Sequence, residues 1–396
     1  MKGTKRLQML SESQTLALTK LVRQLQAEGK DVVGLTLGEP DFDTPDHIRA
    51  AAIAAINEGF THYTPVAGIP ALRQAIAAVY KPHGADYAAA NVVVSNGAKQ
   101  SVVNVVMSLL DPEDEVIIPV PYWVSYIEIF KMAEAHVVEV QTTLDNGYKM
   151  TAAQLEAAIT PKTKMLLLNS PNNPTGGMYS REEAAALVAV LERYPEIILV
   201  SDEIYEHIWF EHPTVCFASF PSILDRLVII SGVSKGFAMT GWRIGYSISP
   251  KWIAELCEKY QGQITSGASS VSQRAALAAY TGPLDPTEKM RLKFKERRDF
   301  MGEKLNAIPH LRSYSPPGAF YFYPDLSYFL GKKTAKGEVI RDIDHLTEYL
   351  LLEGGVAVIP GTAFGTDCHV RISYAYAMDI LEKGCERLAN ALNALQ

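Results

Sequence analysis

The sequence predicts an α/β protein: a large domain with a mostly parallel, seven-stranded sheet, and a smaller α/β domain. Between about residues 90 and 250, short β-rich runs alternate with alanine-rich amphipathic segments. The runs are apolar with little alternation, which indicates strands buried on both faces, as in parallel sheets. The length of 396 residues is large for a single core and favours two domains.

Seven runs are the expected strands of the large domain. In chain order they are NVVVS, DEVIIPV, AHVVEV, KMLLLNS, EIILVSD, RLVIIS and RIGYSIS. Helix-like segments such as KQSVVNVVMSLL and REEAAALVAVLERY lie between them. Ligands of such sheets bind beyond the carboxyl ends of the strands, so we expect the functional residues to follow these runs.

The character of the sequence changes after about residue 285. LDPTEKMRLKFKERRDFMGEKLNAI is typical of a long charged helix with an apolar stripe. The shorter β-like pieces LRSYSP, AFYFYPDL, VAVIPG and CHVRISYA follow, and a final helix closes the chain. We therefore expect a large domain over residues 46–285 and a small domain formed by residues 1–45 and 286–396.

Composition excludes several classes of function. The net charge of −7, without a long basic run, argues against nucleic acid or an anionic membrane as a partner. No apolar stretch is long enough to span a membrane, and the basic start MKGTKR is not followed by the apolar run of a secretory signal. The four cysteines are far apart, and no His-x-x-x-His pair lies near a carboxylate. We expect reduced thiols in a cytoplasmic protein and no metal site.

Candidate ligand-binding residues follow four of the expected strands. They are Ala98 and Lys99 in NGAKQ, Asn173 in NSPNNPTGG, Asp202 and Tyr205 in SDEIY, and Lys235 with Arg243 in SKGFAMTGWRIGY. Each has an ordinary explanation on its own, as a turn, a helix cap or a solvated lysine. Together they supply a helix N-terminus for a phosphate, an acid, hydroxyl and amide donors, and an amine. That set is what pyridoxal phosphate requires.

The chain resembles the aspartate aminotransferase-like, class I pyridoxal-phosphate aminotransferases of fold type I. The resemblance covers nearly the whole chain and rests on LTLGEPDFDTP, HYTPVAGIPALR, NGAKQ, PYWVSY, NSPNNPTG, SDEIY, SKGFAMTGWRIGY, VIPGTAFG and VRISYA, in the family's order. It implies a ping-pong enzyme that moves an amino group between an L-amino acid and a 2-oxo acid, with pyridoxal 5′-phosphate as its cofactor.

The resemblance also implies catalytic roles. Lys235 is similar to the lysine that forms the Schiff base with the cofactor. A free lysine, with a pKa of about 10.4, is protonated at neutral pH, so burial and the charge of Arg243 should lower this pKa. Asp202 resembles the partner of the pyridine nitrogen, and Tyr205 and Asn173 resemble the donors to the ring 3′ oxygen.

Other residues resemble those that hold the cofactor phosphate and ring. Arg243, Ser234 and the backbone N–H groups of Ala98 and Lys99 would bind the phosphate, and Trp123 would stack on the ring. Gly232 stands where many relatives have a serine, and Ser231 lies one position earlier. Whether either contributes to phosphate binding stays open at this point.

The resemblance places substrate contacts as well. Arg371 resembles the clamp of the α-carboxylate, since a planar guanidinium binds a carboxylate through two hydrogen bonds. Gly38, Trp123 and Asn173 would line the substrate pocket. Tyr63 resembles the residue that reaches the phosphate of the neighbouring subunit, which implies a homodimer with shared active sites.

The amino donor is the open question. Lys99 stands where one branch of the family binds the distal carboxylate of aspartate or glutamate, which favours these substrates; alternatively, only its backbone serves the phosphate. Ser11 lies where relatives that also accept prephenate carry a basic residue, which argues against prephenate. Aminotransferases for alanine or aromatic amino acids, and a carbon–sulfur lyase on the same scaffold, remain alternatives. A non-catalytic regulator would need an added DNA-binding module, for which the chain has no room.

Overall fold

The computed structural model describes residues 3–396, apart from the side chain of Arg6. Its main feature is a seven-stranded sheet in the order β2-β8-β7-β6-β5-β3-β4. Only β8 is antiparallel to its neighbours. The strands are β2 (Val92–Ser95), β3 (Glu115–Val120), β4 (His136–Gln141), β5 (Thr163–Asn169), β6 (Ile198–Asp202), β7 (Leu227–Gly232) and β8 (Gly245–Ile248). All seven expected strands are present, and the predicted fold class is confirmed.

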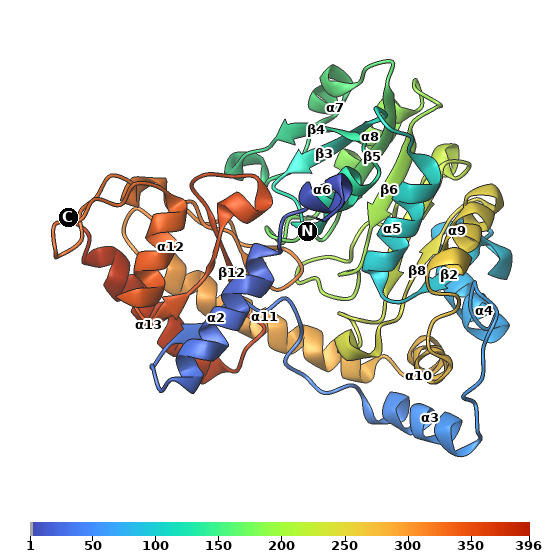
Figure 1. Cartoon of the computed structure of the whole chain (residues 1–396), viewed down its shortest axis with the longest axis horizontal. Helices are drawn as coiled ribbons and strands as arrows, with labels where there is room; N and C mark the ends of the chain where they lie inside the picture. Colours follow the sequence, from blue (N-terminus) through green and yellow to red (C-terminus); the bar gives the residue numbers. More distant parts are fainter. Residues whose placement is uncertain (1–2) are drawn as a thin grey trace.

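Helices cover both faces of this sheet (Figure 1). The central strands are apolar and almost fully buried because both faces are covered. One face packs against α5 (Ala98–Leu109), α6 (Ser125–Met132) and α9 (Lys251–Ile264). The other packs against α3 (Asp46–Asn57), α4 (Pro70–Val79), α7 (Ala152–Ala158), α8 (Arg181–Leu191) and α10 (Ser270–Thr281).

A second unit surrounds its own core of buried aromatic and aliphatic side chains. It contains a three-stranded antiparallel sheet, β11-β12-β9, and a parallel pair, β1-β10. Its strands are β1 (Val33–Gly34), β9 (Tyr321–Phe322), β10 (Val356–Ala357), β11 (Ile359–Pro360) and β12 (Val370–Ser373). Its helices are α2 (Gln14–Ala27), α11 (Asp285–Asn306), α12 (Ile343–Leu352) and α13 (Met378–Asn393).

Two details of this unit bear on the sequence analysis. The expected β-like piece LRSYSP forms only an isolated bridge at Arg312, because Pro316 at its end and Pro317 after it cannot donate to a ladder. The pairing of β1 with β10 joins the N-terminal segment to the C-terminal part of the chain. The domain boundaries at residues 45 and 285 stay a prediction.

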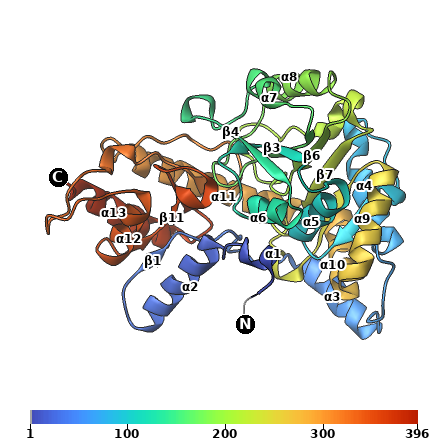
Figure 2. The ribbon, with the colours of Figure 1, turned by 45° about the horizontal axis from the view of Figure 1, so that its top comes forward.

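The N-terminal segment connects the two units. The short helix α1 (Lys5–Gln8) lies near α6, and α2 continues to the small unit (Figure 2). The backbone N–H of Ser11 donates to Glu128 of α6, while Val22 and Leu25 of α2 pack against Leu351 and Ala357. None of the helices within residues 3–396 is both long and apolar enough to cross a membrane.

Candidate active site

A cavity of about 530 Å³ lies where the carboxyl ends of the central strands face the small unit. Its lining contains every predicted site residue except Tyr63. The residues it brings together are Gly38, Ala98, Lys99, Trp123, Asn173, Asp202, Tyr205, Ser234, Lys235, Arg243 and Arg371. The Tyr63 side chain is 100% exposed and lies outside this cavity.

Lys235 follows β7 by three residues and extends into the cavity. Its Nζ donates a hydrogen bond of 2.5 Å to the carbonyl oxygen of Gly38. Burial lowers the pKa of Lys235 to about 8, and the charges of Arg371 and Arg243 act in the same direction. Near neutral pH this amine is therefore neutral far more often than a free lysine, as a nucleophile requires.

Asp202 ends β6 and is buried at the floor of the cavity. Burial raises its pKa to about 6, while the hydrogen bonds from Tyr126 and the N–H of Ile204 oppose this rise. The Tyr126 hydroxyl donates to Asp202 Oδ2 at 2.6 Å, and the Ile204 N–H donates to Oδ1 at 3.1 Å. These bonds favour the ionised carboxylate, which suits a partner for a protonated ring nitrogen.

The N-terminus of α5 and Arg243 meet at one end of the cavity. Among the described residues, no side chain caps the first turn of α5, so the N–H groups of Ala98 and Lys99 are available to an anion. Arg243 has a left-handed backbone, with φ of 56°, and donates to the carbonyl oxygens of Thr240 and Asn96. Gly97 is needed here, because a Cβ on it would lie 2.4 Å from Arg243 Nη2.

Local packing explains why neither Gly232 nor Ser231 lines the cavity. A Cβ on Gly232 would lie 2.7 Å from the Cα of Gly245, so a serine there would require the backbone to shift. The Ser231 side chain is fully buried and donates to Glu206 Oε1 at 2.6 Å. Neither residue lines the cavity, whereas Ser234 does.

Arg371 lies on β12, on the small-unit side of the cavity, and is 3% exposed. Its Nη1 donates to Asn173 Oδ1 at 3.0 Å, and its Nη2 donates to the Thr36 carbonyl oxygen at 2.8 Å. The guanidinium lies over the ring of Tyr321, with 4.6 Å between the guanidinium carbon and the ring centre. These contacts fix the plane of the guanidinium, which is what two-point carboxylate recognition needs.

Two tyrosines complete the site and were missed in the sequence. Tyr126 lies three residues after Trp123, one helical turn on, and this spacing was a usable signal. No comparable spacing in the sequence pointed to Tyr321. Its hydroxyl lies 2.9 Å from the Tyr205 hydroxyl, and a Cβ on Gly38 would approach it to 3.3 Å.

Cations outnumber acids around the cavity. Glu39 and Asp202 are the lining acids, whereas the lining cations are Lys20, Arg23, Lys99, Lys235, Arg243 and Arg371. Lys20 and Arg23 lie on α2, and the sequence analysis did not anticipate them. This balance favours anionic ligands, since charges of one sign in a cleft concentrate ligands of the opposite sign.

Lys99 is exposed within this group. Its Nζ lies 4.9 Å from the centre of the Trp123 ring. Burial of the ammonium, and secondly the charge of Arg243, lower the pKa of Lys99. The Lys99 side chain therefore lines the cavity while it remains open to solvent.

Comparison with known proteins identifies the family. The protein-family model described as aminotransferase class I and II matches residues 30–388. The chain belongs to this aminotransferase family. The aspartate/prephenate aminotransferase of Cereibacter sphaeroides is 45% identical over 95% of both chains, and the aspartate aminotransferase of Geobacillus stearothermophilus is 44% identical over 100% of both.

Solved aminotransferase structures agree. The aspartate aminotransferase of Rhizobium meliloti matches with a TM-score of 0.97 at 40% identity, over 100% of both chains. That of Thermus thermophilus, solved with maleate, matches with a TM-score of 0.93 at 39% identity, over 99% of this chain and 100% of that one. The predicted membership of the class I aminotransferases is confirmed.

Proposed function

We propose that the protein is a pyridoxal-phosphate-dependent aspartate aminotransferase that uses 2-oxoglutarate as the amino acceptor. The observation that carries this proposal is the meeting of Lys235, Asp202 and Arg371 in one cavity. An amine with a lowered pKa, a buried acid and a fixed carboxylate clamp are the three groups that amino-group transfer needs. Membership of the aminotransferase family supports the proposal.

The residues fit pyridoxal phosphate. Its phosphate would be held by Arg243, Ser234 and the free N–H groups at the start of α5, because these provide positive charge and donors together. Asp202 would hold the ring nitrogen. Trp123 would stack on the ring of the cofactor. Because the Lys99 ammonium lies over the Trp123 ring, a cofactor bound on that face would displace it.

The protein's own groups have separate tasks in this reaction. When bound, the cofactor would accept the electron pair released at the substrate Cα. Lys235 would be its covalent attachment point and, once freed, would carry the proton to and from the substrate Cα. Asp202 would keep the ring nitrogen protonated. Asn173 and Tyr205 would donate hydrogen bonds to the ring oxygen.

Substrate charge supports aspartate and glutamate as donors. Arg371 would bind the α-carboxylate, and Lys99, with Lys20 and Arg23 on α2, would attract the distal carboxylate. The Thermus thermophilus relative was solved with maleate, which is a dicarboxylate, and several relatives are named for aspartate.

The test is a panel of amino donors with 2-oxoglutarate, measured for the wild type and Lys99→Ala. We expect aspartate and glutamate to be the best donors. In Lys99→Ala, their kcat/KM should fall by the equivalent of about 2 to 5 kcal/mol, because a desolvated charge pair is cut on one side. Alanine has no distal carboxylate and should lose much less. Equal losses for all donors would contradict a side-chain role for Lys99. If the wild type shows no amino-group exchange that depends on a keto acid, the lyase alternative would be favoured.

Prephenate is a second candidate acceptor because several relatives are named for it. Ser11 does not line the cavity and supplies no cation, which argues against prephenate. Adding prephenate with aspartate as the donor tests this directly, and a turnover comparable to that of 2-oxoglutarate would reverse this conclusion.

We also propose a cytoplasmic homodimer with shared active sites. Its support is the fully exposed Tyr63, outside the cavity of its own chain, together with the exposed apolar side chains Ile53, Ile56 and Trp252. The four cysteines are free, as in a reducing compartment. Mixing Tyr63→Phe and Lys235→Ala chains should restore activity if Tyr63 serves the partner's site. No recovery after verified subunit exchange would contradict this role.

A further inference from the structure

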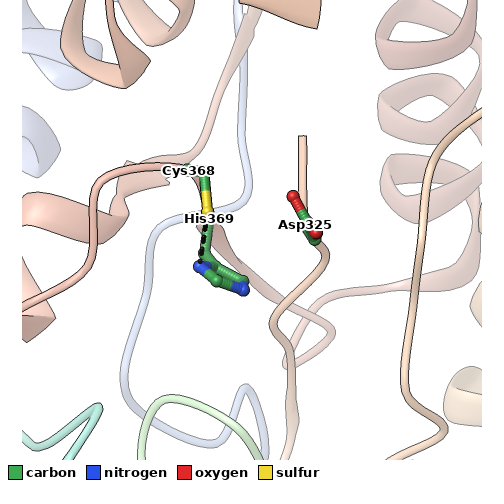
Figure 3. A group of neighbouring side chains, drawn as sticks. All are labelled: Asp325, Cys368 and His369. Atoms are coloured by element: carbon green, nitrogen blue, oxygen red, sulfur yellow. Dashed lines mark hydrogen bonds between the residues drawn. The ribbon is translucent and has the colours of Figure 1, made fainter. Parts of the chain in front are cut away.

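One group of possible metal ligands lies outside the active site. Within residues 3–396, Asp325, Cys368 and His369 are the only three residues of their kind whose ligand atoms all lie within 4.8 Å of one another (Figure 3). None of them lines the active-site cavity. Asp325 lies three residues beyond β9, and Cys368 and His369 precede β12.

The fold brings these ligands together from two segments. Asp325 and His369 face each other in an isolated antiparallel bridge, and the Leu326 N–H donates to the Cys368 carbonyl oxygen at 2.8 Å. Cys368 lies in a bend before the strand, so its side chain is not forced to the opposite face from His369. All three side chains are partly exposed, which leaves a path for an ion from solvent.

The distance between the sulfur and nitrogen ligands suits a tetrahedral ion. Cys368 Sγ and His369 Nδ1 are 3.4 Å apart. Metal–ligand bonds of about 2.3 Å to sulfur and about 2.05 Å to nitrogen place these two atoms roughly 3.5 Å apart at a tetrahedral zinc ion. The two atoms therefore need to move little to bind the same ion.

The carboxylate of Asp325 is only partly engaged by other groups. Asp325 Oδ1 accepts from the Ser327 N–H at 2.8 Å, and Oδ2 lies 3.6 Å from Arg312 Nη1. Arg312 is largely exposed and also contacts Asp145 at 3.2 Å, so it has an alternative partner when an ion approaches Asp325. Its charge nevertheless opposes a cation at this position.

We propose that Asp325, Cys368 and His369 bind one thiophilic divalent cation, such as Zn²⁺, with water in the remaining position. A thiolate, an imidazole nitrogen and a carboxylate oxygen are ordinary zinc ligands. The thiol proton passes to solvent as the metal–sulfur bond forms. The ion would join the segment after β9 to the segment before β12, the two strands that place Tyr321 and Arg371 in the active site.

No metal site was predicted from the sequence, and the cluster at Asp325, Cys368 and His369 gives reason to revise that prediction. The ligands come from positions 325 and 368–369, which are too far apart to form a recognisable spacing motif. Only the antiparallel bridge brings them together.

The experiment uses the holoenzyme after treatment with a chelator. Equilibrium dialysis against Zn²⁺ should give one bound equivalent, and Cd²⁺ should produce the ultraviolet band of a cadmium–thiolate bond. Cys368→Ser should abolish this band, while Cys385→Ser, which removes a thiol elsewhere, should keep it. Asp325→Asn and His369→Gln should each weaken binding at least as much as the roughly 10- to 100-fold typical when only a hydrogen-bond partner of a ligand is removed.

Arg312→Ala gives a test in the opposite direction. Removing the guanidinium should tighten Zn²⁺ binding severalfold, because a competing positive charge leaves the site. Zn²⁺ should also raise the melting temperature of the wild type, and not that of Cys368→Ser. The proposal is overturned if the wild type shows no saturable binding, or if Cys368→Ser keeps the cadmium band.

Discussion

On the sheet side of the active-site cavity, the functional residues come from strand ends. Asp202 is the last residue of β6, and Lys235 and Arg243 lie between β7 and β8. On the small-unit side, Arg371 receives support from Asn173, Thr36 and Tyr321, which lie far apart in the chain. The sheet side therefore depends on strand register, whereas the small-unit side depends on how two units pack together.

The two sides of the cavity also differ in the ligand that their residues suit. The sheet side supplies the amine, the acid and the helix N-terminus that suit the cofactor. The small-unit side supplies Arg371 and, from α2, Lys20 and Arg23, which suit the carboxylates of the substrate. If the division is correct, damage to one side should spare the task of the other.

The largest effect is expected for Lys235→Ala, on the sheet side. Transamination of every donor should fall by several orders of magnitude, because the variant lacks the proposed covalent attachment point and proton carrier. Lys149→Ala, which removes a lysine paired with Glu183 outside the cavity, is the control. In the wild type, borohydride reduction and peptide mapping should label Lys235, and label at another lysine would contradict its role.

A smaller effect is expected for Arg371→Lys, on the small-unit side. Lysine keeps the charge but loses the two-point geometry, so kcat/KM should fall by the equivalent of about 2 to 3 kcal/mol for all amino acids, mainly through KM. The affinity for pyridoxal phosphate, measured by its absorbance on titration, should not change. An equal loss of cofactor affinity would remove the distinction between the two sides.

The smallest effect is expected for Tyr126→Phe. Its hydroxyl stabilises ionised Asp202, so removing it should raise the Asp202 pKa further above about 6. If Asp202 holds the ring nitrogen as proposed, cofactor binding to the cofactor-free protein needs the carboxylate. It should therefore weaken as the pH falls through this pKa, and the decline should begin at a higher pH in the variant.

At neutral pH, the expected loss for Tyr126→Phe is about tenfold, in line with one hydrogen bond to a charged group. Tyr148→Phe, which removes a buried hydroxyl elsewhere, should leave the binding curve unchanged. Identical pH profiles for the wild type and Tyr126→Phe would show that Tyr126 does not control Asp202.

The same contrast explains what sequence could predict. All seven strands of the main sheet were predicted because each leaves an apolar or β-branched run in the sequence, and Asp202 and Lys235 lie at or just after the ends of two of these runs. Tyr321 and the ligand group at Asp325 and Cys368 depend on contacts between distant segments. Lys20 and Arg23 look like ordinary solvated residues of an amphipathic helix, because only the packing of α2 places them at the cavity.

The turn between β7 and β8 has a consequence for how this sequence can vary. Lys235 and Arg243 are eight positions apart, and the left-handed backbone at Arg243 brings the chain back into β8 beside Gly97. Inserting or deleting one residue between them would change the distance from the amine to the guanidinium and shift the register of β8 against β7. We therefore expect any change in the number of residues between Lys235 and Arg243 to disrupt the site.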